Sequence, residues 1–297
     1  MAILVDMHTA CLVQGITGQE GKKAAAWMRA AGTKVLAGVT PGKGGQLVDD
    51  VPVFNSVKEA VRAFPSINTS TVYAPARFAK DAVIEAVNAG ILLVHLIAEN
   101  VPVRDAAELI AAAHVRNATV LGPSSIGIIS PGKGKIGSIG GETNTQFSPG
   151  PIGVISKSGG MSSEIALLLT RSGIGQSTVV GIGGDRLIGT SFADLLPLFE
   201  HDAETKAVVM IGEIGGTYEE EAADVLLQKK FTKPLIAFIS GAFAETLPQG
   251  VSFGHAGAIV DKDIGTLRGK IEALQKAGAI ILKSPDELPQ KIRELGI

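Results

Sequence analysis

Short apolar segments alternate with amphipathic segments along nearly the whole chain, and this rhythm constrains the fold more than any other feature. In the first half, the segments expected to form strands cover residues 10–13, 35–39, 71–73, 92–97 and 119–121. The segments with helical spacing cover residues 22–31, 57–64, 79–89 and 103–114. Strands and helices that alternate in this way form parallel sheets with right-handed crossovers. The sequence therefore predicts an α/β fold that begins with a Rossmann-like domain.

The same alternation starts again in the second half. Here the expected strands cover residues 152–156, 176–181, 207–211, 235–239 and 279–282. The expected helices cover residues 161–172, 192–199, 219–227, 270–277 and 288–295. We expect a second, flavodoxin-like doubly wound domain, in which ligands bind at the carboxyl ends of the strands.

Residues 123–151 interrupt this rhythm with four prolines and many glycines. Such a composition predicts an extended connector with a small hairpin, and a domain boundary near residue 150. We therefore expect a first domain at residues 1–130, a connector at 131–150 and a second domain at 151–297.

The bulk composition excludes several classes of protein. The 297 residues are 45% hydrophobic and 19% charged, which is enough apolar material for two cores. A net charge of −2 gives no support to a nucleic-acid partner. The single cysteine, Cys11, excludes a disulfide within the chain and fits a reducing compartment. Because we expect no membrane span and no signal peptide, we expect a cytoplasmic protein, or a mitochondrial matrix protein whose transit peptide has been removed.

Two glycine-rich loops of the first domain have the character of a phosphate-binding site. Gly15, Gly18 and Gly21 lie between the first expected strand and helix, where free backbone N–H groups and the helix dipole favour an anion. Lys43 lies in a second glycine-rich loop, residues 38–45, where a dinucleotide-binding domain would have an acidic residue for the ribose. The loops therefore favour a ligand with several phosphates over NAD, with ordinary tight turns as the alternative.

Four loops of the second domain fall at one edge of its expected sheet, because each of them follows a strand. They cover residues 156–160, 181–186, 212–216 and 250–259. His255 lies in the last loop among small residues, which let a bulky anion approach the imidazole. Glu213 is placed to hydrogen-bond this imidazole. Considered alone, His255 would be interpreted as a structural histidine. The backbone amides placed to hold a phosphate on His255 belong to Ser158, Gly159 and Gly160. Together, the four loops predict an active site.

These motifs closely resemble those of the α subunit of succinyl-CoA synthetase and of related nucleoside-diphosphate-forming acid–CoA ligases. The matching segments are Gly15-Ile-Thr-Gly18, Gly38-Val-Thr-Pro-Gly-Lys-Gly-Gly45, Gly181-Ile-Gly-Gly-Asp185, Gly212-Glu-Ile-Gly-Gly216 and Gly254-His-Ala-Gly-Ala-Ile259. The resemblance covers essentially the whole chain. It implies that a phosphohistidine phosphorylates a carboxylic acid and that the thiol of CoA then displaces the phosphate.

The resemblance also implies roles for individual residues. His255 would carry the phosphoryl group, and Glu213 would hydrogen-bond its ring. CoA would be bound by Thr17, Gly18, Gln19, Glu20, Lys43, Ile97, Ala98 and Glu99. ATP or GTP and Mg²⁺ would belong to a separate β subunit with an ATP-grasp fold, in an αβ or α2β2 assembly. This chain itself would hold no metal.

Two residues depart from the succinyl-CoA synthetase pattern and are similar to the synthetase part of ATP-citrate lyase. Ser163 stands where a substrate-side tyrosine is usual, and Arg186 stands where a proline is usual. The lost tyrosine opens space and the arginine offers a bidentate partner for an anionic group. Citrate, or another acid that is bulkier or more anionic than succinate, is therefore an alternative substrate. The competing interpretation is that Arg186 pairs with Asp185 and that Ser163 only fills space.

Two other classes of protein stay open at this point. A CoA-binding module without catalysis would explain the first domain but gives no reason for the loops of His255 and Glu213. A nicotinamide-dependent oxidoreductase would share the Rossmann-like fold, but it would need a different glycine spacing and an acidic residue for the ribose.

Overall fold

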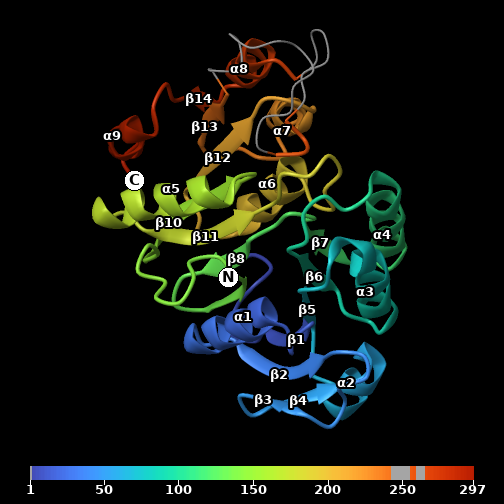
Figure 1. Ribbon diagram of the computed structural model, residues 1–297. Helices are drawn as coiled ribbons and strands as arrows, with labels where there is room; N and C mark the ends of the chain where they lie inside the picture. Colours follow the sequence, from blue (N-terminus) through green and yellow to red (C-terminus); the bar gives the residue numbers. More distant parts are fainter. Residues whose placement is uncertain (1, 242–254, 259–264) are drawn as a thin grey trace.

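The computed structural model describes residues 2–241, 255–258 and 265–297 (Figure 1). Two sheets of seven strands each lie one above the other in this view, and helices flank both of them. This arrangement confirms the predicted α/β fold with two sheets. No helix in the described ranges is both long enough and apolar enough to cross a membrane.

The first sheet has the strand order of a Rossmann fold. Its strands are β1 (Ala10–Gln14), β2 (Lys34–Val39), β3 (Leu47–Val48), β4 (Val51–Phe54), β5 (Thr69–Val72), β6 (Leu93–Leu96) and β7 (Thr119–Leu121). They lie in the order β3-β4-β2-β1-β5-β6-β7, and all pairs are parallel except β3 with β4. When only the parallel strands are counted, this is the order 3-2-1-4-5-6, which reverses between β1 and β5. Such a reversal point is where a doubly wound sheet binds its ligand.

Helices cover both faces of the first sheet. They are α1 (Gln19–Ala30), α2 (Val57–Ala63), α3 (Ala76–Asn88) and α4 (Val103–Val115). On β1, Cys11 belongs to a core cluster with Met28 of α1, whereas its neighbour Leu12 belongs to a cluster with Val83 of α3. Neighbouring residues of a strand point to opposite faces, so a strand buried on both faces is apolar throughout. This is why β1 was visible in the sequence as a continuous apolar run.

The second sheet has the strand order of a flavodoxin-like fold. Its strands are β8 (Gly127–Ser130), β9 (Gly134–Gly137), β10 (Pro149–Ser156), β11 (Gln176–Gly181), β12 (Ala207–Glu213), β13 (Leu235–Ser240) and β14 (Ile280–Ile281). Its helices are α5 (Gly159–Arg171), α6 (Phe192–His201), α7 (Tyr218–Leu227), α8 (Leu267–Lys276) and α9 (Leu288–Glu294). The parallel strands lie in the order β14-β13-β12-β10-β11, which is the order 2-1-3-4-5 of flavodoxin. The order reverses between β10 and β12.

The proline-rich stretch after β7 contributes two strands to the second sheet. β8 and β9 form an antiparallel hairpin, and β8 pairs with β11 in the antiparallel direction. Ile128, Ile129 and Ile136 of this hairpin are buried, which explains why it joins the sheet and does not remain an extended link. The second sheet thus begins at Gly127, while the domain limits at residues 130 and 150 stay a prediction.

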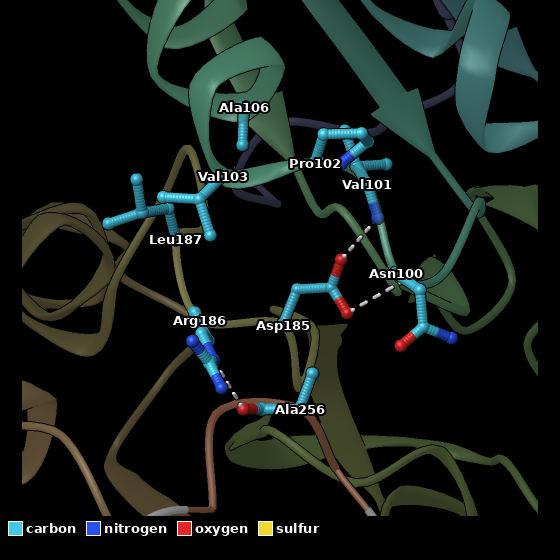
Figure 2. A pocket seen from close by; sticks show the side chains of 9 residues that line it. All are labelled: Asn100, Val101, Pro102, Val103, Ala106, Asp185, Arg186, Leu187 and Ala256. Atoms are coloured by element: carbon cyan, nitrogen blue, oxygen red, sulfur yellow. Dashed lines mark hydrogen bonds between the residues drawn. The ribbon is translucent and has the colours of Figure 1, made fainter.

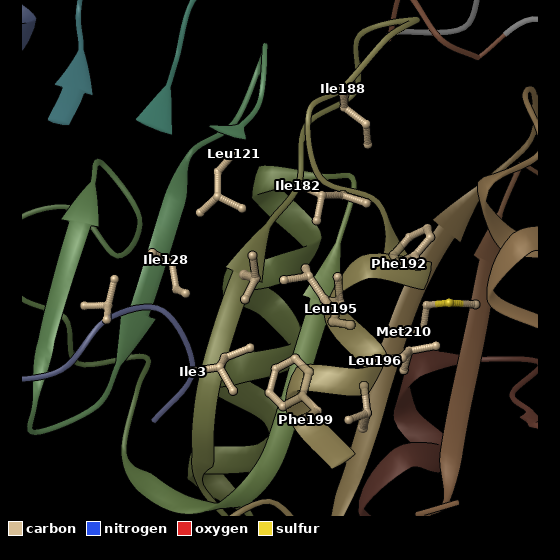
Figure 3. Packing of buried hydrophobic residues seen from close by; sticks show 14 of the residues in the cluster. Ile3, Leu121, Ile128, Ile182, Ile188, Phe192, Leu195, Leu196, Phe199 and Met210 are labelled. Atoms are coloured by element: carbon tan, nitrogen blue, oxygen red, sulfur yellow. The ribbon is translucent and has the colours of Figure 1, made fainter. Parts of the chain in front are cut away.

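One hydrophobic cluster joins the two sheets. Phe192 and Phe199 of α6 pack on the second sheet, together with Ile3 from the N-terminal segment and Leu121 of β7 (Figure 3). The same cluster includes Cys11 of β1. Burying one such large side chain contributes about 1.5–3 kcal/mol to stability. Because this core is continuous, the loops at the two sheet edges are held in a fixed relation to each other.

Candidate active site

His255 lies at the point where the strand order of the second sheet reverses. Lys157 directly follows β10, and Glu213 is the last residue of β12. These side chains, together with Ser158 and Met161 at the start of α5, line a cavity of about 160 Å³ that also contacts His255. Four loops were predicted to form one site, and residues of three of them line this cavity. Gly254 and Ile259, which flank the described part of the histidine loop, lie outside the described residues.

The central contact of this cavity is a hydrogen bond between His255 and Glu213. Nδ1 of His255 lies 2.7 Å from Oε2 of Glu213. A carboxylate only accepts hydrogen bonds, so the imidazole carries its proton on Nδ1. The hydrogen bond raises the pKa of His255 above its ordinary value, against the opposing effect of burial. Burial raises the pKa of Glu213, but the contact with His255 and the charge of Lys157 outweigh it and leave this pKa below its ordinary value.

Gly184 fixes the position of the imidazole from the other side. A methyl group at Gly184 would lie 2.4 Å from Cγ of His255, which is far inside van der Waals contact. The N–H of Gly257 donates to the carbonyl of Gly184 at 2.9 Å, and this ties the histidine loop to the loop that follows β11. The glycine-rich motif at 181–185 therefore makes room for the ring, a role that its sequence alone did not reveal.

Lys157 is a site residue that the sequence reasoning missed. Its side chain is 2% exposed, and its Nζ lies 3.4 Å from Oε1 of Glu213. The same Nζ lies 3.8 Å from Oε1 of Glu219, whose side chain is fully buried. In the sequence, a lysine in a serine- and glycine-rich loop suggests a solvated or phosphate-binding side chain. Only the adjacency of β10 and β12 turns it into a buried partner of Glu213.

The residues predicted to bind a phosphate through their backbone lie at the start of α5. Ser158 is the N-cap, and its side chain accepts a hydrogen bond from the N–H of Met161 at 3.4 Å. Gly159 and Gly160 are the first residues of the helix, and no acidic residue lies in its first turn. A methyl group at Gly159 would lie 2.6 Å from the side chain of Ile126, so this position requires glycine. A helix N-terminus without acidic side chains attracts an anion through its N–H groups and its dipole.

Of the two predicted substrate residues, Arg186 lies nearer to the histidine loop than Ser163 does in the described cavities. Arg186 lines a second cavity of about 250 Å³, and its Nε donates to the carbonyl of Ala256 beside His255 at 3.3 Å (Figure 2). Ser163 is half-buried on α5 and lines neither this cavity nor that of His255. Arg186 is thus the residue of the two that adjoins the histidine loop.

Asp185 connects the two halves of the molecule. Its carboxylate accepts hydrogen bonds from the N–H groups of Asn100 and Val101, both at 3.2 Å (Figure 2). Burial raises the pKa of Asp185, although these two hydrogen bonds oppose the shift. Because Asp185 points toward the first half, its carboxylate is directed to these amides and not to Arg186. The contact links the segment 97–99 to the loop that supports His255.

The first sheet carries a larger and mostly apolar cavity at its own reversal point. It measures about 520 Å³ and lies beside Gly15 after β1 and Tyr73 after β5. Pro41, Pro75 and Phe78 add apolar walls. Pro41 belongs to the matching segment 38–45, but Pro75 and Phe78 had not been singled out from the sequence, because single apolar residues in loops carry no pattern.

The predicted CoA-binding residues lie along the same edge of the first sheet. Thr17 donates from Oγ1 to Oγ1 of Thr40 at 3.1 Å, which joins the two glycine-rich loops. Gly18 caps α1 without a side chain, and Gln19 and Glu20 form its first turn. Lys43 is exposed on the second loop. Ile97, Ala98 and Glu99 follow β6 and are held there because the N–H of Ser124 donates to the carbonyl of Ala98 at 2.8 Å.

Two family models match the chain in the same two regions. The CoA binding domain matches residues 6–100, and the CoA-ligase model matches residues 155–280. The first therefore covers the large apolar cavity, and the second covers the cavity of His255. The match to the first model supports CoA as a ligand of this chain. Within the described ranges, no group of three or more His, Cys, Asp or Glu side chains is arranged to hold a metal ion.

Similar proteins cover the whole chain. The α subunit 2 of succinate–CoA ligase (ADP-forming) from Archaeoglobus fulgidus is 48% identical over 99% of this chain and 100% of its own length. A subunit of the ADP-forming sulfoacetate–CoA ligase from Bilophila wadsworthia is 42% identical over 99% of both chains.

A solved structure gives the same result for the fold. The ATP citrate lyase from Methanothrix soehngenii, in complex with citrate and coenzyme A, superposes with a TM-score of 0.89 at 29% identity. The match covers 99% of this chain but only 50% of that enzyme, so this chain corresponds to half of the longer one. With near-complete coverage by ADP-forming ligase subunits and both family models in place, the chain belongs to the family of the α subunits of ADP-forming succinate–CoA ligases.

Proposed function

We propose that His255 of this α subunit carries a phosphoryl group on Nε2 during the formation of an acyl-CoA. The observation that supports this most directly is the 2.7 Å hydrogen bond from Nδ1 to Glu213, since it assigns the proton to Nδ1 and directs bond formation to the other ring nitrogen. The N-terminus of α5, which lines the same cavity, would hold the phosphoryl oxygens through Ser158, Gly159 and Gly160.

The proposed reaction proceeds through three displacements. The lone pair of Nε2 forms a bond to the γ-phosphorus of a nucleoside triphosphate while the bond to the nucleoside diphosphate breaks. A carboxylate oxygen of the acid then takes the phosphoryl group from Nε2, which gives an acyl phosphate. Finally, the thiolate of CoA attacks the acyl carbon, and inorganic phosphate leaves. Throughout the first two steps, Glu213 stabilises the positive charge on the phosphorylated ring.

The first sheet has the features that CoA needs. The apolar walls of its cavity, Tyr73 and Phe78 among them, suit a heteroaromatic ring. Lys43 and the N–H groups at the start of α1, where Lys23 pairs with the acidic Glu20, suit phosphates. From there, Ile97, Ala98 and Glu99 lead along the sheet edge to the contact between Asn100 and Asp185, next to the loop of His255. We infer that the thiol arm of CoA follows this path. When CoA is bound, it supplies the thiol that accepts the acyl group.

The partner of this chain would supply the nucleotide. We propose a β subunit with an ATP-grasp fold that binds ATP or GTP together with Mg²⁺, in an αβ or α2β2 assembly. The relatives named as α subunits support a heteromeric enzyme. A cytoplasmic location remains our expectation.

Succinate is the acid that the names of the relatives support best. A more anionic acid is the second candidate, because Arg186 adjoins the loop of His255, and because other relatives are named for sulfoacetate and citrate. A panel of acids assayed with the αβ complex and with Arg186→Ala distinguishes the two. If succinate reacts fastest and the variant keeps that preference, Arg186 does not select the acid.

A labelling experiment tests the phosphohistidine itself. The αβ complex incubated with ATP labelled at the γ-phosphate should yield acid-labile, base-stable label on this chain, and His255→Ala should yield none. A wild-type complex that binds CoA but takes up no label would contradict the proposal and favour a non-catalytic CoA-binding module. Tight binding of NADH would instead favour an oxidoreductase.

A further inference from the structure

A row of buried charges lies behind the imidazole of His255, and the three displacements do not involve it directly. The row runs from Glu213 through Lys157, Glu219 and Lys270 to Glu220. Only Glu220 has substantial access to solvent, with 31% of its side chain exposed, while the others are between 0% and 12% exposed. Removing a charge from water is costly unless an opposite charge compensates it. The alternating signs provide that compensation along the row.

Within this row, Lys157 forms a closer ion pair with Glu213 than with Glu219. Its Nζ lies 3.4 Å from Glu213 but 3.8 Å from Glu219. Glu219 has a second cation, because Lys270 pairs with its other oxygen. Lys270 is itself held by Glu220 and by the carbonyl of Gly216, both at 2.9 Å. The far end of the row therefore stays compensated without Lys157.

Among the residues that the structure describes, Glu213 has no such second cation. One oxygen, Oε2, accepts from Nδ1 of His255, and the other, Oε1, has no hydrogen-bond donor among the described residues. Within that part of the chain, the ion pair with Lys157 is what compensates Oε1. Without such compensation, burial raises the pKa of a carboxylate and favours its protonated form. The protonated group can donate a hydrogen bond to the imidazole, so it no longer fixes the imidazole proton on Nδ1.

We propose that Lys157 is a positioning residue that keeps the Glu213 carboxylate ionised against Nδ1 of His255 and so reserves Nε2 for the phosphoryl group. The proposal rests on the phosphohistidine proposed above. Nζ of Lys157 contacts the Glu213 carboxylate, which in turn contacts Nδ1 of the imidazole. It acts through Glu213, as an orienting group acts on a metal- or proton-binding histidine.

The other charged groups around the site do not replace Lys157. Glu219 of α7 accepts from the backbone N–H of Glu213 at 3.0 Å, and its charge repels that of the Glu213 carboxylate. The ring of Tyr218 lies 5.6 Å from Nζ of Lys157 and favours the cation without adding charge. Glu99 and Asp185 act on the imidazole of His255 from other loops. Since all these carboxylates are negative, loss of Lys157 should raise the pKa of Glu213.

The test compares Lys157→Met with Lys157→Arg in the assembled αβ complex. In Lys157→Met, phosphoenzyme formation from ATP at neutral pH should slow by about tenfold or more, and the acid limb of its pH profile should move upward by about one unit. Lys157→Arg keeps the charge and should restore both the rate and the pH profile. Affinity for CoA, whose cavity lies on the first sheet, is the control and should not change in either variant.

A double variant with balanced charges serves as a control in case Lys157→Met alone does not fold. Lys157→Met with Glu219→Gln removes one buried charge of each sign, and the glutamine oxygen can still accept from the N–H of Glu213. Nitrogen-15 NMR of the histidine-labelled complex then reports the tautomer of His255 without any phosphoryl transfer. We expect Nδ1–H in the wild type and in Lys157→Arg, and a mixture of tautomers in the double variant.

An error in the proposed function and an error in the proposed role of Lys157 would give different results. If the wild type forms no phosphoenzyme, the proposed function is wrong, while the tautomer measurement still decides the role of Lys157. If the wild type forms phosphoenzyme and the charge-removing variants keep its pH profile and the pure Nδ1–H tautomer, the proposed role of Lys157 is overturned.

Discussion

Two histidines, one in each half of the molecule, show how differently the two halves use polar groups. His95 on β6 is fully buried, and its ring lies 2.6 Å from Oγ1 of Thr71 and 2.9 Å from the carbonyl of Ser125. Burial lowers the pKa of His95 to about 4, so it is neutral. His255 has a carboxylate partner in place of these neutral groups, and its pKa is raised. Complete burial among neutral groups keeps His95 uncharged, whereas the ionised Glu213 favours the charged form of the partly exposed His255.

The same contrast separates the two cavities. The cavity of the first sheet has mostly apolar walls, such as Phe78, beside the side chains of Asp81 and Glu85, and its size suits the binding of a large ligand. The cavity of the second sheet is backed by buried charges, which suits a group whose charge changes during a reaction. The first half is therefore built for binding and the second for chemistry. Each prediction below alters one side of this contrast.

The largest effect is expected from Glu213→Gln. The glutamine keeps the shape of the side chain but removes the charge that is proposed to stabilise the phosphorylated ring. Phosphoenzyme formation in the αβ complex should fall by about 10²–10⁴-fold, as is typical when the anionic partner of a catalytic histidine becomes an amide. The dissociation constant of CoA, measured by titration calorimetry, should stay the same. An equal loss of CoA affinity would show that the two halves are not separable.

The next largest effect concerns stability, and it comes from His95. Because the folded state lowers the pKa of His95 to about 4, the unfolded chain binds a proton below pH 6.5 that the folded chain does not. This group should therefore remove up to about 3 kcal/mol of stability as the pH falls from about 6.5 to about 4. Denaturant unfolding of the wild type and of His95→Gln should differ by this pH dependence.

His255 provides the opposite control for that measurement. Its pKa is raised in the folded state, so its contribution to stability is complete below the ordinary value of 6.5 and is lost as the pH rises through the folded value. Glu213, whose pKa is lowered, contributes above its ordinary value of 4.5 and loses that contribution as the pH falls. If His95→Gln and His255→Gln changed stability over the same pH range, the contrast between the two histidines would be wrong.

Physical reasons explain which strands could be predicted from the sequence and which could not. Strands such as β1 and β12 are buried on both faces, so each is written locally as an apolar run. β4 was missed because only alternate residues are buried and Pro52 interrupts it, and β3 was missed because it has two residues. The order of the strands, in contrast, depends on contacts between distant segments.

The site residues also differ in whether the sequence near them carries a signal. His255 and Glu213 were found because each lies in a glycine-rich loop after a strand, which is a local signal. Lys157 and Glu219 were missed because their meaning depends on neighbours in space. Glu219 begins a run of three glutamates that suggests a solvated helix face, yet it is fully buried between two lysines. Burial of a charge becomes visible only when the helices have been placed.

A smaller loss of activity is expected from Gly184→Ala. The added methyl group would lie 2.4 Å from Cγ of His255, so the ring or the loop of Gly184 must shift. A displacement of about 1 Å at a reacting group typically costs about 10²-fold in rate. Rapid-quench measurement of phosphoenzyme formation would detect this loss, and unchanged CoA affinity would confirm that it is confined to the second half. A rate equal to that of the wild type would mean that the imidazole is not held by this contact.

The smallest effect is expected from Phe78→Ala, which alters the binding half alone. Phe78 is 50% exposed while lining the large cavity, so its loss should barely affect folding but should remove an apolar wall from CoA. The dissociation constant of CoA should rise by about 3- to 10-fold, which corresponds to about 1 kcal/mol of aromatic contact. Leu92→Ala, which removes a 58% exposed side chain outside the cavity, is the matched control.

Phosphoenzyme formation should be the same in both variants, because no buried charge near His255 has changed. A slower phosphorylation in Phe78→Ala would mean that the apolar cavity also shapes the reacting site, and the division between a binding half and a chemical half would then have to be abandoned.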